Sequence, residues 1–305
     1  MRVSSLYNST AMLDQMNRNS MEINNLMQQM STQKRINLPS DDPIGASRMV
    51  QLNREQSALA QYQSNIERVS GTLAMQESYV NAISDQLLGL NDVLLSAANG
   101  THSTEDMSGY GAQLESMVDS LVATLNAQNE NGSYLFAGTK TDTQPVQWDE
   151  ENQQYIYAGN DNTRETTVAN GVDITENTLL AQAFSNSGDD LAVLNQLKSL
   201  SEKMQDPSIP QEEYMAEITT ALDSTKHASD KIAAVYTDLG GRQNRLTLLS
   251  DSHTDVSIAN DQVIRDISET DWATTSMNLQ LYINSVQITN KAYSMVSDLS
   301  LFSVI

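Results

Sequence analysis

The sequence contains no cysteine, and aromatic residues make up only 5% of its 305 positions. The absence of cysteine excludes disulfides, thiolate metal sites and cysteine nucleophiles. It suits a protein that passes through a reducing cytosol and ends outside the cell, and it equally suits many ordinary proteins. The chain has only five prolines but 14 methionines and many Ser, Thr, Asn and Gln residues. This composition favours long helices with thin apolar stripes rather than one thick globular core.

Basic residues are also scarce. The chain has 17 Lys and Arg against 39 Asp and Glu, a formal net charge of −22. A chain this acidic needs a local basic patch to hold a phosphate backbone, and its basic residues are scattered, so we expect no nucleic-acid partner. No calcium loop of the D-x-[DN]-x-[DN]-G type is present, and we expect no metal and no other cofactor.

Long hydrophobic runs and motifs of catalysis are missing as well. No apolar run approaches the roughly 18–20 residues of a membrane span, so we expect no contact with a membrane. The N-terminus is polar and lacks the apolar region of a Sec signal peptide, so export would need another route. The three histidines are far apart, and no P-loop, G-x-G-x-x-G or G-x-S-x-G motif occurs. We therefore expect no catalytic residues and no enzyme.

The strongest pattern present is an apolar residue at every seventh position between residues 45 and 99. A second row, three residues further on, is interrupted at Glu55 and Gln76. Seven such heptads predict one long helix of the coiled-coil type. A second helix is expected after the turn at 99–106, packed antiparallel to the first. The first row consists of Leu52, Leu59, Ile66, Leu73, Val80, Leu87 and Leu94.

The periodicity changes at about residue 131, and between 139 and 186 the heptads are absent. Short β-prone segments alternate there with Gly, Asn and Asp, which predicts a small inserted β-rich domain. Helical periodicity returns at about residue 191, with Asp189 or Asp190 as the N-cap. The fold class expected is mainly α: long antiparallel helical rods, or a coiled coil, formed by the N- and C-terminal halves around a small β-rich insert. The rods would comprise residues 41–138 and 187–274.

The terminal segments, residues 1–40 and 275–305, carry narrow stripes of Met, Leu and Ile. An isolated pair of such helices is marginal, because helices gain most of their stability from packing. We expect these coiled-coil segments to be disordered or loosely ordered in the monomer and to bury their stripes against other subunits; the alternative is that the stripes pack only within one chain. The expected interface residues are Leu13, Ile23, Met27, Leu281, Ile288, Met295, Leu299 and Phe302.

Residues 34–47, "KRINLPSDDPIGAS", interrupt the helical pattern with two prolines, two aspartates and a glycine. Asp42 is placed to be an N-cap with Pro43 at the first helical position, and Asp41 and Asp42 suit the positive end of the helix dipole. A general acid–base pair would need a pocket that the neighbouring sequence does not supply. We therefore interpret the run as a joint between two helices and expect a second joint at 268–273. The residues assigned to the first joint are Arg35, Asn37, Asp41, Asp42 and Pro43.

The same run resembles the N-terminal signature of bacterial flagellins and their relatives, Arg-Ile-Asn followed by Asp-Asp-Pro-Ala-Gly. Ile44 stands where the family has a small residue. Residues 299–302, "LSLF", look like the matching C-terminal end of the family. Residues 134–145, "YLFAGTKTDTQP", resemble a segment typical of the members that form the junction between hook and filament.

This resemblance implies a secreted, extracellular component of the flagellum that leaves the cell by type III export after a transient cytoplasmic stage. Its expected role is a structural adaptor, a ring of copies that joins the hook, through the first hook-associated protein, to the flagellin filament. A cytosolic export chaperone would hold the C-terminal segment. One alternative is a flagellin, the filament subunit itself. Another, from a different class, is a cytosolic enzyme or signalling coiled coil with a β-rich sensor.

Overall fold

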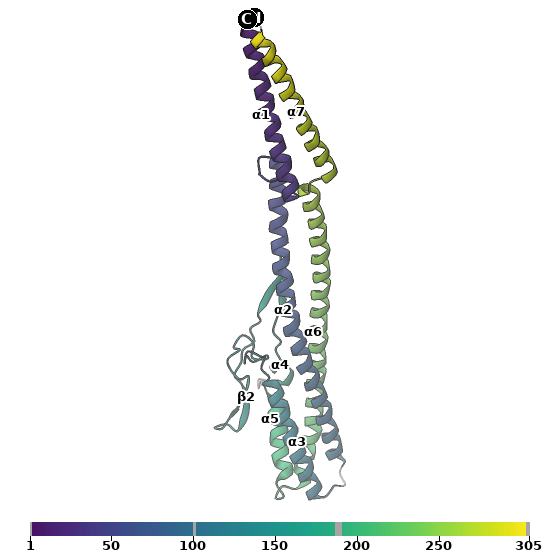
Figure 1. Cartoon of the computed structure of the whole chain (residues 1–305). Helices are drawn as coiled ribbons and strands as arrows, with labels where there is room; N and C mark the ends of the chain where they lie inside the picture. Colours follow the sequence, from purple (N-terminus) through teal and green to yellow (C-terminus); the bar gives the residue numbers. More distant parts are fainter. Residues whose placement is uncertain (1, 100–101, 187–190, 303–305) are drawn as a thin grey trace. The chain divides into compact units, whose positions relative to one another are not determined.

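The computed structural model describes residues 2–99, 102–186 and 191–302 (Figure 1). Two compact units can be distinguished, one of residues 1–59 and 254–305 (unit 1) and one of residues 60–253 (unit 2). Most of the described chain is helical, and the strands are confined to its middle, which confirms the predicted fold class. The two longest helices, α2 (Pro43–Ala98) and α6 (Gln211–Ser268), each contribute to both units.

Unit 1 contains both ends of the chain. Helices α1 (Arg2–Thr32) and α7 (Trp272–Phe302) lie side by side in it (Figure 1). Their contact includes a polar pair, because Asn19 is 2% exposed and its Nδ2 donates a hydrogen bond to Ser285 Oγ at 3.1 Å. Among the described residues of this unit, the only buried apolar side chains are Ile36, Leu52 and Leu59. Unit 1 therefore has very little core of its own.

Unit 2 has an extended core built by α2 and α6 with two shorter helices, α3 (Thr104–Leu125) and α5 (Ala192–Gln205). The predicted heptad row is buried along this unit, and every member from Ile66 to Leu94 is at most 4% exposed. Helices α3 and α5 approach closely at Gly111, where a Cβ atom would lie 2.9 Å from the Ser201 carbonyl oxygen. The N-cap residues predicted for α5, Asp189 and Asp190, lie outside the described residues.

The two interruptions of the second heptad row have different causes. Glu55 is exposed. Gln76 is buried, donates from Nε2 to the Glu176 carbonyl oxygen at 2.8 Å, and accepts from Thr178 Oγ1 at 2.6 Å. A buried amide with both of its ends satisfied costs little, so the polar residue in the row serves to fasten the β region to α2.

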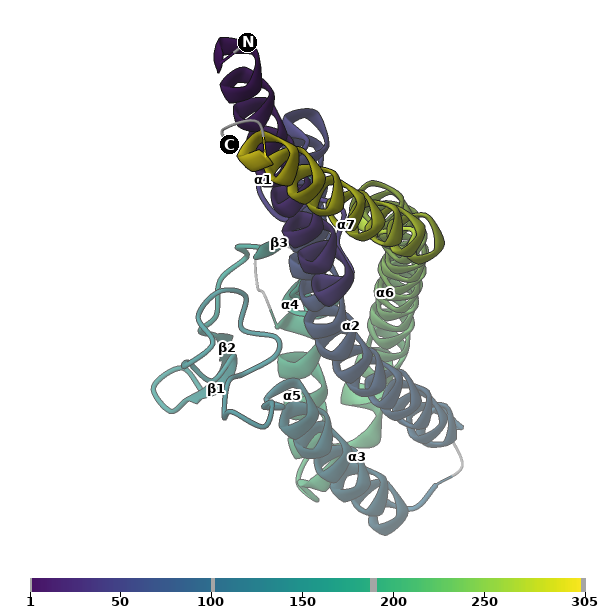
Figure 2. The ribbon, with the colours of Figure 1, turned by 45° about the horizontal axis from the view of Figure 1, so that its top comes forward.

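The β region consists of two antiparallel hairpins and the short helix α4 (Ala181–Phe184) (Figure 2). Strand β1 (Val146–Asp149) pairs with β2 (Gln154–Tyr157), and β3 (Glu165–Ala169) pairs with β4 (Val172–Thr175). A two-residue turn, Asn170 and Gly171, joins β3 to β4. Gly171 has a φ of +70°, and Asn-Gly is the pair that such tight hairpin turns favour.

Polar contacts hold the second hairpin against both long helices. Glu176, just after β4, pairs with Arg68 of α2 and with Arg164 before β3, at 2.6 and 2.5 Å. Burial acts to raise the pKa of Glu176, but hydrogen bonds from Thr166, Arg164 and Arg68 outweigh it and the pKa is lowered. On the α6 side, the buried His253 contacts the Val168 carbonyl oxygen through Nε2 at 2.8 Å. These contacts make the hairpin an integral part of unit 2.

The contrast between the units gives a prediction for stability. Leu121→Ala removes a fully buried side chain of unit 2 and is expected to lower the free energy of unfolding by about 2–5 kcal/mol. Leu95→Ala, at a side chain that is 55% exposed on α2, is the matched control and should change it by less than about 0.5 kcal/mol. Urea unfolding followed by circular dichroism measures both. Equal losses for the two variants would contradict this description of the core.

Candidate assembly surface and joint

Large apolar side chains are exposed mainly in unit 1. Of the 20 such side chains that are exposed in the described chain, 15 belong to this unit, although it is the smaller one. Among the residues expected at an interface, Ile23 is half-buried, and the side chains of Leu299 and Phe302 lie outside the described part. The other expected residues are exposed: Leu13 by 46%, Met27 by 50%, Leu281 by 58%, Ile288 by 69% and Met295 by 56%.

Net charge, in contrast to exposed apolar side chains, is concentrated in unit 2. Unit 1 has 11 acidic and eight basic residues, whereas unit 2 has 28 acidic and nine basic residues, a formal net charge of −19. Helices α1 and α7 together contain six charged residues in 62 positions, and each helix is neutral overall. A surface of this kind loses little solvation energy when it is covered, because few charges leave water. The strongly acidic unit 2 favours contact with solvent and repels like surfaces.

The two predicted joints form one structure. Helix α1 ends at Thr32, and Gln33 has a φ of +60°, a left-handed conformation that stops a helix. The backbone N–H of Arg35 donates to the Ser268 carbonyl oxygen at 2.7 Å, and the N–H of Thr270 donates to the Gln33 carbonyl oxygen at 3.2 Å. The α1–α2 and α6–α7 connections are thus hydrogen-bonded to each other.

Arg35 and Asp42 lie at the centre of this joint. Arg35 Nη2 donates to Asp42 Oδ2 at 3.0 Å and to the Ile267 carbonyl oxygen at 2.9 Å. Asp42 precedes α2, which begins at Pro43, and its Oδ1 accepts from the N–H of Gly45 at 2.9 Å. The Gly45 N–H and then the Arg35 guanidinium lower the pKa of Asp42 below its ordinary 3.8. One carboxylate therefore caps a helix and holds the cation that links the two connections.

Asp41 and Asn37 shape the loop itself. Asp41 Oδ2 accepts from the N–H groups of Asn37 and Leu38, at 3.0 and 2.8 Å. Asn37 Oδ1 accepts from Thr32 Oγ1 at 2.8 Å, and its Nδ2 donates to the Lys34 carbonyl oxygen at 3.2 Å. Each polar residue assigned to the first joint thus bonds within it, and the two adjacent aspartates have separate partners.

Three residues of the joint escaped the sequence interpretation. A Cβ atom at Gly45 would lie 2.6 Å from Asp42 Oδ2 and 2.8 Å from Ile36 Cδ1, so any other residue here would displace these two side chains of the loop. Ile36 is buried there. Asp271 caps α7, because its Oδ1 accepts from the N–H of Ala273 at 3.0 Å. The aspartate directly before a helical pattern was a usable signal for this cap.

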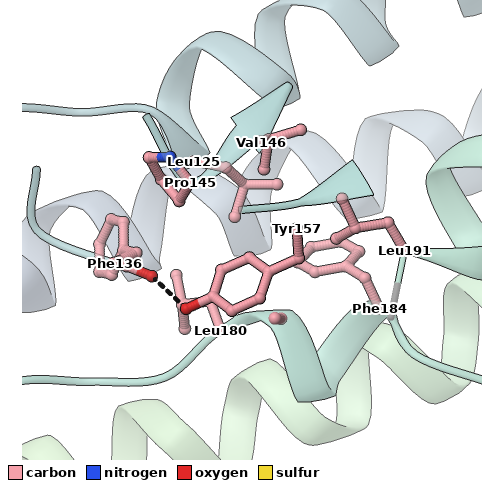
Figure 3. A pocket seen from close by; sticks show the side chains of 9 residues that line it. Leu125, Phe136, Pro145, Val146, Tyr157, Leu180, Phe184 and Leu191 are labelled. Atoms are coloured by element: carbon pink, nitrogen blue, oxygen red, sulfur yellow. Dashed lines mark hydrogen bonds between the residues drawn. The ribbon is translucent and has the colours of Figure 1, made fainter. Parts of the chain in front are cut away.

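The described part of the chain has no evident metal centre, and the apolar pocket of its β region is too small for a ligand. No group of three or more His, Cys, Asp and Glu residues there could hold a metal ion. An apolar pocket in the β region, shown in Figure 3, has Phe136, Leu180 and Phe184 in its lining, and Tyr157 donates to the Phe136 carbonyl oxygen across it at 3.1 Å. Its volume of about 10 Å³ is that of one water molecule, so it is a packing defect and not a ligand site. The described helices include none with the length and apolar character needed to cross a membrane.

Comparison with known proteins agrees with this geometry. Residues 3–141 match the bacterial flagellin N-terminal helical region. The flagellar hook-associated protein 3 of Escherichia coli (strain K12) is 26% identical over 290 residues, which cover 91% of each chain. A structure assigned as a flagellar hook-associated protein of Vibrio parahaemolyticus is 34% identical, with a TM-score of 0.68 over 75% of this chain and all of that one. The flagellar junction protein FlgL of Legionella pneumophila shares the fold, with a TM-score of 0.60 over 73% of this chain and all of that one at 14% identity.

These matches define the class first: the N-terminal half of the chain contains the helical region found in bacterial flagellins. It belongs to the flagellar hook-associated protein family and is similar to hook-associated protein 3.

The glycine in the joint gives the next prediction. Gly45→Ala should force Asp42 and Ile36 apart and open the loop, because the Cβ has no free space. Hydrogen exchange of the amides of residues 35–45 should become faster, while the melting temperature of unit 2 stays the same. Gly71→Ala, elsewhere in α2 where a Cβ meets nothing within 4 Å, is the control and should leave the joint unchanged. Equal protection of the joint in both variants would contradict this role of Gly45.

The lowered pKa of Asp42 predicts how the helix cap in the joint responds to low pH. The carboxylate is charged more readily in the folded joint than in the unfolded chain, so its stabilising contribution is complete above pH 3.8 and is lost as the pH falls through the lower folded value. A titration of the Gly45 amide by NMR should therefore show the cap opening only below pH 3.8. In Asp42→Asn this pH dependence should be absent. A midpoint above pH 3.8 would mean that folding raises the pKa of Asp42, which would contradict this prediction.

Proposed function

We propose that this chain is a structural adaptor of the bacterial flagellum, which joins the hook to the flagellin filament. Its relatives that match over nearly their whole length are named as hook-associated proteins, which supports the adaptor over the alternative of a filament subunit. We propose further that the chain acts without catalysis, as befits a component of the axial structure. Outside the cell, its immediate neighbours would be the first hook-associated protein on the hook side and flagellin on the other.

The observation that carries this proposal is the difference between the two units in how far they bury their apolar side chains. Unit 2 has a continuous apolar core, whereas unit 1 buries only three of its described large apolar side chains and leaves 15 exposed, nine of them on the nearly uncharged helices α1 and α7. Exposed apolar surface of this extent on a soluble protein marks a surface that a partner covers. Helices α1 and α7 would then gain most of their order from neighbouring subunits, and in the free monomer they would be loosely ordered.

The same surface needs protection before assembly. We propose that a cytosolic export chaperone covers the α7 stripe during a transient cytoplasmic stage, and that the chain leaves by the flagellar type III route. The three exposed residues Leu281, Ile288 and Met295 recur every seven positions, which fits recognition of one helix face in an apolar groove. The joint, with Arg35 and Asp42 at its centre, would fix the direction in which this stripe is presented.

Charged side chains in the stripe test the proposal. Leu281→Asp/Ile288→Asp should prevent the chain from occupying hook ends, because two carboxylates cannot be buried in an apolar contact. Cells with this variant as their only copy should have bare hooks, release flagellin into the medium and lose motility. Antibody labelling of purified hooks and immunoblots of the medium measure the outcome.

The control uses two leucines with the same spacing in the other unit. Leu88 and Leu95 are 55% exposed each, so Leu88→Asp/Leu95→Asp adds equal charge at two exposed positions of unit 2. It should support motility, and both variants should keep the melting temperature of the parent chain. Normal motility with Leu281→Asp/Ile288→Asp would refute the proposal. A filament subunit would behave differently, since its loss removes the filament without releasing abundant flagellin.

A further inference from the structure

Unit 2 contains a polar cleft to which the proposed function assigns no role. It has a volume of about 250 Å³ and lies between α2, the loop of residues 129–141 and the segments that flank the second hairpin. Two guanidinium groups, those of Arg68 and Arg164, line it in a unit whose net charge is −19. They share a single carboxylate, that of Glu176, so these three side chains together keep one positive charge in excess.

Several donors at the cleft are unused. Arg164 bonds to Glu176 through Nε, and within the described chain neither of its terminal Nη groups donates a hydrogen bond. The side-chain amide of Asn131 and the hydroxyl of Tyr134 likewise make none there. The side chains of Arg68 and Arg164 are 55% and 48% exposed, so an incoming group can reach them. Such a set of donors around a positive charge fits carboxylates.

The tip of the first hairpin offers carboxylates of the matching kind. Asp149 is used within the turn, since it accepts from the N–H of Glu151 at 2.9 Å and from Asn152 Nδ2 at 2.7 Å. Glu150 and Glu151 are exposed, and in the described chain their carboxylates form no ion pair. The hairpin is held firmly, because the N–H of Tyr155 donates to Asn195 Oδ1 of α5 at 2.6 Å. Figure 2 shows it projecting away from α3 and α5.

The tip and the cleft of one chain lie at opposite ends of this hairpin. The cleft reaches the base of the hairpin, where Gly138 touches Asn160 and the N–H of Thr139 donates to Asn160 Oδ1 at 2.9 Å. Glu150 and Glu151 follow four paired residues, about 13 Å of strand further out. A hairpin of this length places its two glutamate carboxylates away from the cleft of its own chain.

We propose that the acidic β1–β2 tip of one copy docks in the arginine cleft of the next copy of this chain. The contact joins two different surfaces, so it is head-to-tail, and repetition closes a ring when the rotation between copies allows it. This inference rests on the proposed function, which requires copies of the chain to lie side by side. It adds a specific charged contact in unit 2 to the apolar contacts of unit 1 and would fix the spacing between subunits.

Engineered cysteines test the contact directly, because the natural chain has none and gives no background of its own. Glu150→Cys/Asn131→Cys places one thiol on the tip and one in the cleft of every copy. In hooks carrying the assembled protein, a short bis-maleimide should produce a ladder of dimers, trimers and larger species. The variant with Glu150→Cys and Lys226→Cys, whose second thiol is exposed on α6 away from the cleft, should remain monomeric.

The outcomes separate this inference from the proposed function. If labelled hooks carry the variant but no ladder forms, the contact is refuted and the adaptor role stands. A cross-link confined within single chains would also refute it, because the tip would then reach its own cleft. Absence of the unmodified protein from hook ends would instead refute the proposed function.

Charge reversal provides a second readout. Glu150→Lys/Glu151→Lys should reduce the fraction of occupied hooks about tenfold at low salt, with a smaller difference at high salt, because the contact is electrostatic. Asp85→Lys/Asp92→Lys makes the same change of charge at two exposed positions of α2 and should have no effect. Equal occupancy for both variants would refute the contact.

Discussion

The structure depends on one constraint: a single helix with a narrow apolar stripe cannot cover that stripe by itself. In unit 2 the constraint is met within the chain, because α3, α5 and the β region close over α2 and α6 and leave the heptad row from Ile66 to Leu94 almost without exposure. In unit 1 the ends of the same long helices and the α1–α7 pair bury few apolar side chains. The uncovered stripes are the reason to regard the chain as part of an assembly.

The joint anchors both terminal helices at one place in the fold. Two connections that are far apart in the sequence share hydrogen bonds, and Arg35 binds both Asp42 and the end of α6. The terminal helices therefore start from one ordered point and not from two independent hinges. Its polar bonds are mostly exposed to water, so the joint is ordered but adds little to global stability.

The two units also differ in their net charge, and this difference bears on which surfaces can be buried. The terminal helices carry almost no charge and can be buried without a large desolvation cost, whereas unit 2 carries nearly all of the net negative charge. Repulsion between acidic surfaces works against contacts between copies there, unless opposite charges meet at a defined place. The arginine cleft and the acidic hairpin tip would supply such a place, and they would make the spacing between subunits specific where apolar stripes alone would allow sliding.

The sequence by itself determined the long helices, the position of the β insert, the two joints and the cap at Asp42, because these follow from local periodicity and from the bonding habits of residues next to a helix end. It also marked Gln76 as an interruption without showing that this amide holds Glu176 and Thr178. Only the tertiary structure decided which stripes are covered. The apolar pattern of α6 continues through Val256 and Val263, yet both side chains are exposed, whereas Leu239 and Leu246 are buried. Periodicity shows which face of a helix is apolar, but whether another element lies against that face depends on contacts between residues that are distant in the chain.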